Sequence, residues 1–223
     1  MSLPEGETAW DAVGFVLAGG RSSRMGEDKS LLQVGGETLV ARALRILLEA
    51  GLAARIAGAA SPLGAFGAVV EDARPGLGPL GGICAALAST GARLAVFLPV
   101  DLPMLPAALV ECLLDHARIT GRAITVASVN GFAQTFPAVV DRGAGPALEA
   151  ELAAGRGGCF SGFQAAAASL GQAVSVVPVE LLVQSGQVAH PAGLPAARWF
   201  LNVNTPEDLR QANESPGRGH RVS

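Results

Sequence analysis

A glycine-rich loop with basic side chains lies close to the start of the chain. The stretch LAGGRSSRMGEDKSLL, residues 17–32, follows an apolar run. Its candidate ligand-binding residues are Gly19, Gly20, Arg21, Arg24 and Lys29. Adjacent glycines let backbone N–H groups approach a ligand that a Cβ would keep away, and arginine and lysine suit phosphate oxygens. The loop indicates a polyanion such as a triphosphate, although a solvated polar loop has the same composition.

The loop matches neither of two common phosphate-binding motifs. The Walker pattern GxxxxGK[ST] is absent from it, and its glycines are not spaced as in GxGxxG. A Walker-type ATPase and a dinucleotide-binding protein are therefore disfavoured.

An aspartate stands at the end of the most apolar segment of the chain. Residues 94–100 are almost wholly apolar, and Asp101 follows them directly. An acid in this place is either a solvent-facing cap or a ligand for a hard cation such as Mg²⁺, which binds few carboxylates together with substrate phosphates. Position alone does not separate these two interpretations.

Neither histidine nor cysteine offers a nucleophile or a metal site by its spacing. The histidines are His116, His190 and His220, and the cysteines are Cys84, Cys112 and Cys159. No Ser-His-Asp or Cys-His arrangement can be argued from these positions, and there is no CxxC or Cys/His metal spacing. We expect inert thiols in a reducing compartment.

Composition and charge disfavour several classes of protein. The formal charge of −3 gives no overall attraction to nucleic acid. Half the residues are apolar and 16% are charged, which is typical of a compact fold. The first ten residues are acidic where a signal peptide is basic, and no apolar run reaches the ~18 residues that span a membrane. We expect a cytoplasmic protein with no nucleic-acid or membrane partner.

Apolar runs and amphipathic stretches alternate along the chain. We expect strands at 13–18, 54–60, 67–73, 92–101, 122–129, 134–140, 173–179 and 198–203, and helices at 39–51, 78–90, 105–121, 145–155, 162–171 and 205–214. Thr38 is placed to cap the first helix and Gly51 to end it. This alternation predicts an α/β fold with three layers, in which helices cover both faces of a mostly parallel sheet and ligands gather at the carboxyl ends of the strands.

The length fits one large domain. We assign residues 13–213 to it, with an N-terminal extension at 1–12 and a C-terminal tail at 214–223. Residues from about 128 to 158 are a candidate lid over the site.

The loop and three later segments together resemble one enzyme family. LAGGRSSRMGEDKSLL is similar to the signature LA(A/G)GxSxRMGxxK of nucleotidyltransferases, and in particular of the molybdenum cofactor guanylyltransferases, which are MobA-like NTP transferases. The further matches are VVEDARPGLGPLGGI at 69–83, LPVDLPML at 98–105 and NVNTPEDL at 202–209. The four segments occur in the family's order and span residues 17–209. The resemblance implies the family's Rossmann-like nucleotidyltransferase fold.

The resemblance also implies a reaction. The terminal phosphate of molybdopterin would attack the α-phosphorus of GTP, giving the guanine dinucleotide cofactor and pyrophosphate. Because the nucleophile is already an anion, the reaction needs positioning and charge neutralisation rather than a general base. GTP and molybdopterin are the implied partners, besides proteins that deliver the cofactor or accept the product.

Catalytic roles carry over to the matching positions of this chain. Lys29 matches the phosphate-binding lysine, and Arg24 matches a helper at the leaving pyrophosphate. Asp101 matches the residue that holds the nucleotide's Mg²⁺, and Asn202 or Asn204 is a candidate for a further oxygen ligand. We assign Asn202 to the metal, although a turn or cap residue is an equal interpretation of it.

The resemblance implies a wider set of nucleotide-binding residues: Leu17, Ala18, Gly19, Gly20, Lys29, Asp72, Gly78, Gly81 and Asp101. Asp72 matches an acid near the ribose and base, and is otherwise a strand-end residue. Gly78 and Gly81 would allow a close approach of the nucleotide to a helix N-terminus, although tight helix packing also favours them. The loop reads LAGG, as in the guanylyl branch, where the cytidylyl branch typically has LAAG.

Two departures from the family leave the acceptor open. IAGAAS at 56–61 lacks an asparagine that the guanylyl branch often has, and QTFPAVV at 134–140 replaces an HPT-like triplet. The first alternative is a cytidylyltransferase of the same fold that acts on molybdopterin or another phosphorylated acceptor. The second is a catalytically idle nucleotide-binding protein, against which the retained Lys29 and Asp101 argue.

Overall fold

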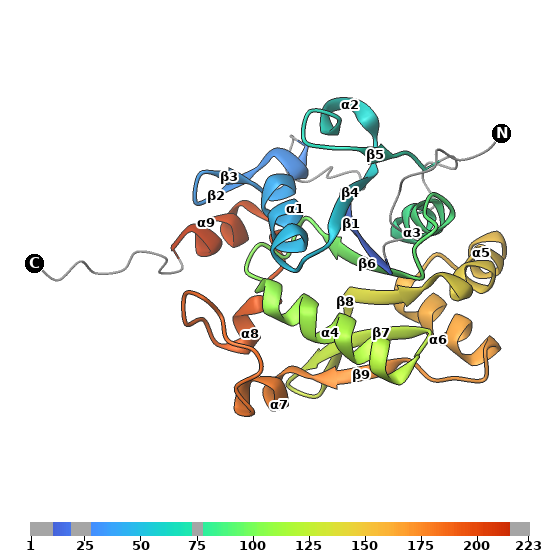
Figure 1. Ribbon diagram of the computed structural model, residues 1–223. Helices are drawn as coiled ribbons and strands as arrows, with labels where there is room; N and C mark the ends of the chain where they lie inside the picture. The colour runs from blue at the N-terminus through green and yellow to red at the C-terminus, as the bar shows by residue number, and fades with distance from the viewer. Residues whose placement is uncertain (1–10, 19–27, 73–77, 215–223) are drawn as a thin grey trace, which may run out of the picture.

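The computed structural model describes residues 11–18, 28–72 and 78–214, and its centre is a seven-stranded sheet with helices on both faces (Figure 1). The strands follow the order β5-β4-β1-β6-β8-β7-β9. Their bounds are β1 Ala12–Ala18, β4 Ala53–Gly58, β5 Val69–Val70, β6 Leu94–Pro99, β7 Ile124–Val129, β8 Phe132–Asp141 and β9 Ser175–Pro178. A separate two-stranded ribbon is formed by β2 Gln33–Val34 and β3 Glu37–Thr38.

The helices divide between the two faces of the sheet. One face carries α1 Leu39–Glu49 and α4 Ala107–Thr120, with α7 Val179–Gln184, α8 Ala196–Trp199 and α9 Pro206–Glu214 contributing to the same core. The other face carries α3 Pro79–Ala88, α5 Gly145–Ala153 and α6 Cys159–Ser169 (Figure 1). A short helix, α2 Ala60–Leu63, and two 3-10 turns, Lys29–Leu31 and Arg142–Ala144, complete the described elements.

The sheet is mostly parallel, as predicted. Every neighbouring pair is parallel except the two that involve β8, which runs antiparallel to both β6 and β7. The three-layer α/β class is therefore confirmed. All the parallel strands point their carboxyl ends to one edge, which we call the carboxyl edge.

Residues of β1 alternate between the two cores. Val13, Phe15 and Leu17 belong to the core under α3, whereas Ala12 and Val16 belong to the core under α1. Phe15 and Phe97 stack with their ring centroids 5.6 Å apart. A strand that is apolar at every position is stable here because both of its faces are removed from water.

The first helix begins and ends where the sequence predicts. Thr38 Oγ1 accepts a hydrogen bond from Ala41 N at 3.4 Å, and Gly51 follows the helix with a φ of +74°. A hydroxyl satisfies an otherwise unpaired N–H at the helix start, and glycine adopts the left-handed conformation that ends it. This helix joins the first loop to β4.

The prediction of a strand at 198–203 is wrong. Trp199 ends α8 and is 1% exposed, and its Nε1 donates to Leu194 O at 2.8 Å. Beyond it the chain runs to Thr205 without joining the sheet, although Val203 is fully buried. Trp199, Phe200 and Val203 are buried in the core that also contains residues of α1 and α4. The sequence pattern does not distinguish this kind of burial from burial within a sheet.

The candidate lid at 128–158 is also wrong. Within this range β8 is inserted between β6 and β7, and α5 packs against α3 and α6 with Leu148 and Leu152 in the core on that face. Ala138, Val139 and Val140 are buried on alternate faces of β8. The segment is part of the core, because its apolar residues need both helix layers to cover them.

No helix among the described residues has both the length and the apolar content to cross a bilayer. The boundaries at residues 13 and 213 stay a prediction.

Candidate active site

Lys29 lies in a 3-10 turn that follows the first loop. Asp28 caps this turn, because its Oδ1 accepts from Ser30 N at 3.0 Å. The Nζ of Lys29 donates to Asp101 Oδ2 at 3.0 Å and to Asn204 Oδ1 at 2.6 Å. Lys29 is the only lysine in the sequence. The structure thus brings the ammonium group of the chain's one lysine to two oxygen acceptors that are distant in the sequence.

The adjacent ends of β1 and β6 place Asp101. Leu17 pairs with Pro99 across these parallel strands, and Val100 N donates to Leu17 O at 3.2 Å. Asp101 follows at the carboxyl edge, beside the point where the first loop leaves β1. The side chains of Lys29 and Asp101 are 17% and 25% exposed, so their ion pair is partly screened from water.

The segment before α9 places the third group. Val203 is buried, and its N–H donates to Asp101 O at 3.0 Å, which fixes this segment beside β6. Asn204 then turns its amide oxygen to Lys29. Asn202, which the sequence analysis assigned to the metal, is exposed two residues earlier. Within the described residues, Asn204 rather than Asn202 joins Lys29 and Asp101.

The start of α9 holds a feature that sequence reasoning missed. Asp208 Oδ2 accepts from Asn204 N at 2.9 Å and from Thr205 N at 2.8 Å, while Asp208 N donates to Thr205 Oγ1 at 3.1 Å. These hydrogen bonds lower the pKa of Asp208. The bond donated by Asn204 N has the largest effect. Threonine followed three residues later by an acid is the sequence signal of a capping box and could have revealed it.

The predicted nucleotide-binding residues that are described lie at the same edge. Leu17 and Ala18 end β1, and Asp72 follows β5, two strands away in the sheet. Gly78 is the N-cap of α3 with a φ of +73°, and Gly81 N donates to Gly78 O at 3.1 Å. Because α3 leads from β5 to β6, its N-terminus also faces the carboxyl edge. No side chain caps that N-terminus among the described residues, and such helix ends attract anions.

Part of the predicted site lies outside the described residues. Gly19, Gly20, Arg21 and Arg24 all fall between residues 19 and 27. Their roles in phosphate binding therefore stay predictions. The described part of the site is the end of β1, the turn with Lys29, and the segments that carry Asp101 and Asn204.

The donor set fits Mg²⁺ better than a transition metal. In the described ranges no group of three His, Cys, Asp or Glu side chains gathers in one place. Asp101 offers one carboxylate, and Asn204 offers an amide oxygen close by. Mg²⁺ is commonly bound by one or two carboxylates together with substrate phosphates and water, whereas Zn²⁺ needs three or four protein ligands.

The two described histidines have structural partners. His116 Nε2 lies 2.9 Å from Ser175 Oγ, and His190 Nε2 lies 3.1 Å from Met104 O. His190 Nδ1 also accepts from Ala192 N at 3.0 Å, so this ring is neutral and donates through Nε2. Burial lowers the pKa of His190, partly offset by its hydrogen bond to Met104. His220 is outside the described residues.

The cysteines behave as inert thiols. All three are among the described residues, and they form no disulfide. Burial raises the pKa of Cys159 to about 11, and burial followed by the charge of Asp115 raises the pKa of Cys112. A thiol with a raised pKa carries little nucleophilic thiolate at neutral pH.

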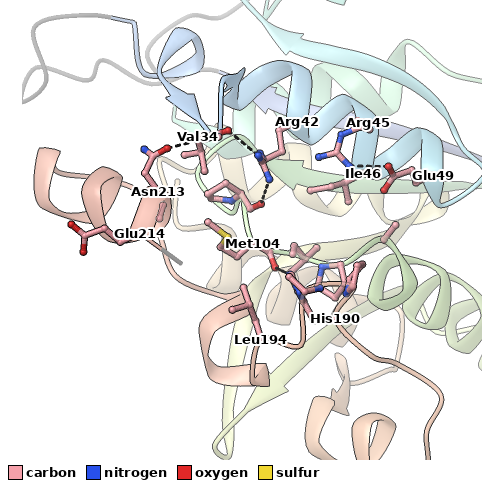
Figure 2. A pocket seen from close by; sticks show the side chains of 18 residues that line it. Val34, Arg42, Arg45, Ile46, Glu49, Met104, His190, Leu194, Asn213 and Glu214 are labelled. Carbon is pink, nitrogen blue, oxygen red and sulfur yellow. Dashed lines mark hydrogen bonds and ion pairs between the residues drawn. The ribbon is translucent and has the colours of Figure 1, made fainter. Parts of the chain in front are cut away.

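A pocket outside the candidate active site lies at the end of α9 that is farther from Asn204. Figure 2 shows this pocket of about 940 Å³, which lies between α1, the loop after β6, the loop at 190–194 and the last residues of α9. Arg42 donates to Val34 O at 2.8 Å, and Arg45 pairs with Glu49 at 2.8 Å (Figure 2). Neither Lys29 nor Asp101 lines it. The pocket is therefore separate from the lysine and aspartate at the carboxyl edge.

Comparison with known proteins places the chain in a family. The model of the MobA-like NTP transferase domain matches residues 14–170. Over 206 residues the chain is 34% identical to the molybdenum cofactor guanylyltransferase of Rhizobium meliloti (strain 1021), with 88% of each protein covered. A 103-residue stretch is 43% identical to the molybdenum cofactor guanylyltransferase of Xanthomonas euvesicatoria pv. vesicatoria (strain 85-10), and it covers 46% of this chain and 53% of that protein.

The fold is also known from solved structures. The crystal structure of molybdopterin-guanine dinucleotide biosynthesis protein A from Archaeoglobus fulgidus aligns with a TM-score of 0.72 at 22% identity, covering 90% of this chain and 96% of that one. This likeness supports the fold, and the family model spans more than half of the sequence. The chain belongs to the MobA-like NTP transferase family and is a nucleotidyltransferase.

Proposed function

We propose that this enzyme transfers GMP from GTP to the terminal phosphate of molybdopterin, which yields molybdopterin guanine dinucleotide and pyrophosphate. The observation that carries the proposal is the meeting of Lys29 with Asp101 and Asn204 at the carboxyl edge of the sheet. The names of the relatives, which are molybdenum cofactor guanylyltransferases, support the choice of substrates.

The chemistry requires binding and charge neutralisation. An oxygen of the acceptor phosphate forms a bond to the α-phosphorus of GTP, and the bond from that phosphorus to the β-phosphate oxygen breaks. The electron pair leaves with pyrophosphate. Both reacting groups are anions, so the enzyme must hold them in line and offset their repulsion.

Lys29 must change partners during this reaction. In the structure its ammonium group pairs with Asp101 and donates to Asn204. A triphosphate offers the ammonium more negative charge than one carboxylate does. We therefore assign to Lys29 an exchange from Asp101 to the phosphates, which also releases the carboxylate for a cation.

Asp101 would hold Mg²⁺, with Asn204 or Asn202 as a further oxygen ligand. When bound at these residues, Mg²⁺ would supply positive charge that offsets the charge of the phosphates. Among the described residues no group of three His, Cys, Asp or Glu side chains could hold the ion, so Asp101 would act together with ligands from the substrate.

The rest of the described site suits a nucleotide. No described side chain caps the N-terminus of α3 at Gly78, which offers N–H groups to an anion. Asp72, at the same edge of the sheet, is the residue that we assign to the ribose. The preference for guanine rests on the LAGG sequence of the first loop. A cytoplasmic location, and partners that deliver the cofactor or accept the product, stay predictions.

The first test compares nucleotides by thermal stabilisation. We expect GTP with Mg²⁺ to raise the melting temperature of the pure protein more than CTP, ATP or UTP does, because a ligand of the native state opposes unfolding. Addition of molybdopterin should then release pyrophosphate from GTP. Asp101→Asn protein that is folded should release little pyrophosphate.

Other outcomes would change the proposal. A shift selective for CTP would point to a cytidylyltransferase of the same fold. Selective binding of GTP without release of pyrophosphate would indicate an idle nucleotide-binding protein. Unchanged transfer by the Asp101→Asn enzyme would contradict the assigned mechanism.

A further inference from the structure

We propose that Asp208 is a positioning residue of the active site: its carboxylate fixes Asn204, and Asn204 in turn fixes the ammonium group of Lys29. This inference rests on the proposed function for its effect on transfer. Its structural part concerns only the described residues Lys29, Asn204, Thr205 and Asp208.

One oxygen of Asp208 holds two successive N–H groups. Oδ2 accepts from Asn204 N at 2.9 Å and from Thr205 N at 2.8 Å. The bond to Thr205, the N-cap of α9, belongs to an ordinary capping box, and Thr205 Oγ1 completes that box by accepting from Asp208 N at 3.1 Å. The bond to Asn204 lies outside the box, because Asn204 precedes the N-cap.

The extra bond completes a clamp on the backbone of Asn204. On the preceding side, Val203 is fully buried and its N–H donates to Asp101 O at 3.0 Å. On the following side, the helix begins with Leu209 N donating to Thr205 O at 3.1 Å. Between these two anchors, the carboxylate of Asp208 is what fixes the peptide of Asn204.

The fixed backbone determines where the amide oxygen of Asn204 lies. That oxygen accepts from Lys29 Nζ at 2.6 Å, whereas Lys29 and Asp101 are 3.0 Å apart. Lysine has a flexible side chain with four methylene groups, so its position depends on the partners that hold its end. Removal of the Asp208 carboxylate should therefore loosen Lys29 through Asn204, in addition to removing the direct electrostatic attraction between the carboxylate and the ammonium group.

The chain offers an unusually direct way to observe this. Because Lys29 is the only lysine, protein grown with ¹⁵N-labelled lysine gives a single side-chain ammonium signal. We expect Asp208→Ala to shift or broaden that signal in nucleotide-free protein. We also expect it to lower kcat/KM for guanylyl transfer about tenfold, since a small misplacement of a catalytic group is costly.

Thr205→Ala is the matched control. It removes the hydroxyl that accepts from Asp208 N and weakens the helix cap, but it leaves the carboxylate bonded to Asn204 N. If Asp208 has only a structural role, both variants should act through the stability of α9. The lysine ammonium signal should then be the same in Asp208→Ala and in Thr205→Ala. Our proposal predicts that only Asp208→Ala moves the signal.

A double-mutant cycle with Asn204→Ala tests the route of the effect. If Asp208 acts through Asn204, then Asp208→Ala lowers kcat/KM in the wild type but not in the Asn204→Ala background. Fully additive losses would overturn the proposal, as would an unchanged lysine signal in Asp208→Ala. Asp208→Asn removes the charge that attracts Lys29 but keeps an acceptor oxygen for Asn204 N, so it should restore most of the signal and the rate if the hydrogen bond is what matters.

The two proposals can fail separately. The lysine signal is recorded without nucleotide, so it reports on the clamp even if the enzyme has another substrate. If Asp208→Ala does not fold, Asp208→Ser removes the carboxylate with a smaller change in volume. The lysine ammonium signal of that variant then tests the proposal. Lack of GTP binding by the wild type would contradict the proposed function and leave the result on the clamp intact.

Discussion

Lys29 Nζ lies 3.0 Å from Asp101 Oδ2, although 72 positions separate the two residues in the sequence. Lys29 thus forms an ion pair with Asp101, the carboxylate to which the proposed mechanism assigns Mg²⁺. Because two cations close to one carboxylate repel each other and a triphosphate attracts the ammonium group, nucleotide binding and the release of Lys29 from Asp101 should be coupled.

Loss of the lysine charge should reduce transfer strongly. We expect Lys29→Met, which keeps most of the length of the side chain, to lower kcat/KM by roughly 10²–10³, the scale of a lost electrostatic contact to a transition state. Lys29→Arg should recover only part of the rate, because a planar guanidinium does not replace a compact ammonium. The measurement is pyrophosphate release with GTP and molybdopterin.

The control for this prediction is Arg210→Met. Arg210 is an exposed cation of α9 that pairs with Glu207 on the same helix. Its removal changes the net charge of the protein as Lys29→Met does but leaves the active site alone. Equal rates for the two variants would show that Lys29 has no special role.

Loss of the acidic charge at Asp101 should change the requirement for metal. We expect Asp101→Asn to raise the Mg²⁺ concentration needed for half-maximal transfer, since an amide is a weaker ligand for a hard cation than a carboxylate is. Titration of activity with Mg²⁺ at saturating GTP measures this. An unchanged titration curve would show that Asp101 does not bind the metal. Removal of Mg²⁺ with a chelator should abolish transfer by the wild-type enzyme.

A methyl group at Gly58 should disturb the start of the first loop. A Cβ there would lie 2.9 Å from Ala18 O, the last backbone carbonyl of β1, and 3.2 Å from Leu63 Cδ1. Because a backbone carbonyl within a parallel pair cannot move aside freely, we expect Gly58→Ala to lower the free energy of unfolding by about 1–3 kcal/mol. The stabilisation by GTP should fall as well.

Gly67→Ala provides the comparison for Gly58→Ala. A Cβ at Gly67 would meet nothing within 4 Å, and the backbone is not in the left-handed region. This substitution should leave stability unchanged or raise it by up to ~1 kcal/mol, through the lower entropy of the unfolded chain. Urea denaturation measures the free energy of unfolding of both variants. Equal values for Gly58→Ala and Gly67→Ala would refute the steric argument.

His190 should make stability depend on pH. Burial lowers its pKa in the folded protein, so the unfolded chain binds a proton more readily. The stabilising contribution is therefore complete above the unfolded pKa of about 6.5 and is lost as the pH falls from there through the lower pKa of the folded protein. Protonation would also place a proton on Nδ1, which accepts from Ala192 N.

Substitution of His190 should remove this part of the pH dependence. The difference in free energy of unfolding between the wild type and His190→Gln should narrow as the pH falls from about 7.5 to about 5, across the ordinary titration range of histidine. Urea denaturation at several pH values measures it. Parallel stability curves for the two proteins would contradict the prediction.

Local sequence patterns were sufficient for much of the fold. Runs that are apolar at every position, as at 13–18 and 94–100, correspond to strands β1 and β6, which are buried on both faces. Thr38 and Gly51 mark the ends of α1 because caps depend on a few neighbouring atoms. These features are set by short-range chemistry, so the sequence reveals them.

Patterns failed where burial has more than one cause. The run at 198–203 contributes Trp199, Phe200 and Val203 to the core, and it does not form a strand. The segment around β8 offered no sign that it would run antiparallel between β6 and β7. The choice of neighbour in a sheet depends on contacts between distant parts of the chain, which periodicity does not encode.

The sequence by itself determined which kinds of residue the site would contain: a basic loop after the first strand, an acid after a central strand, and an asparagine-containing segment before the last helix. Only the tertiary structure decided that Asn204, rather than Asn202, reaches Lys29 and that Asp208 holds Asn204 in place. The physical reason is that Lys29 and Asn204 are 175 positions apart, and their contact depends on the sheet edge and the buried Val203, which together fix where the two segments meet.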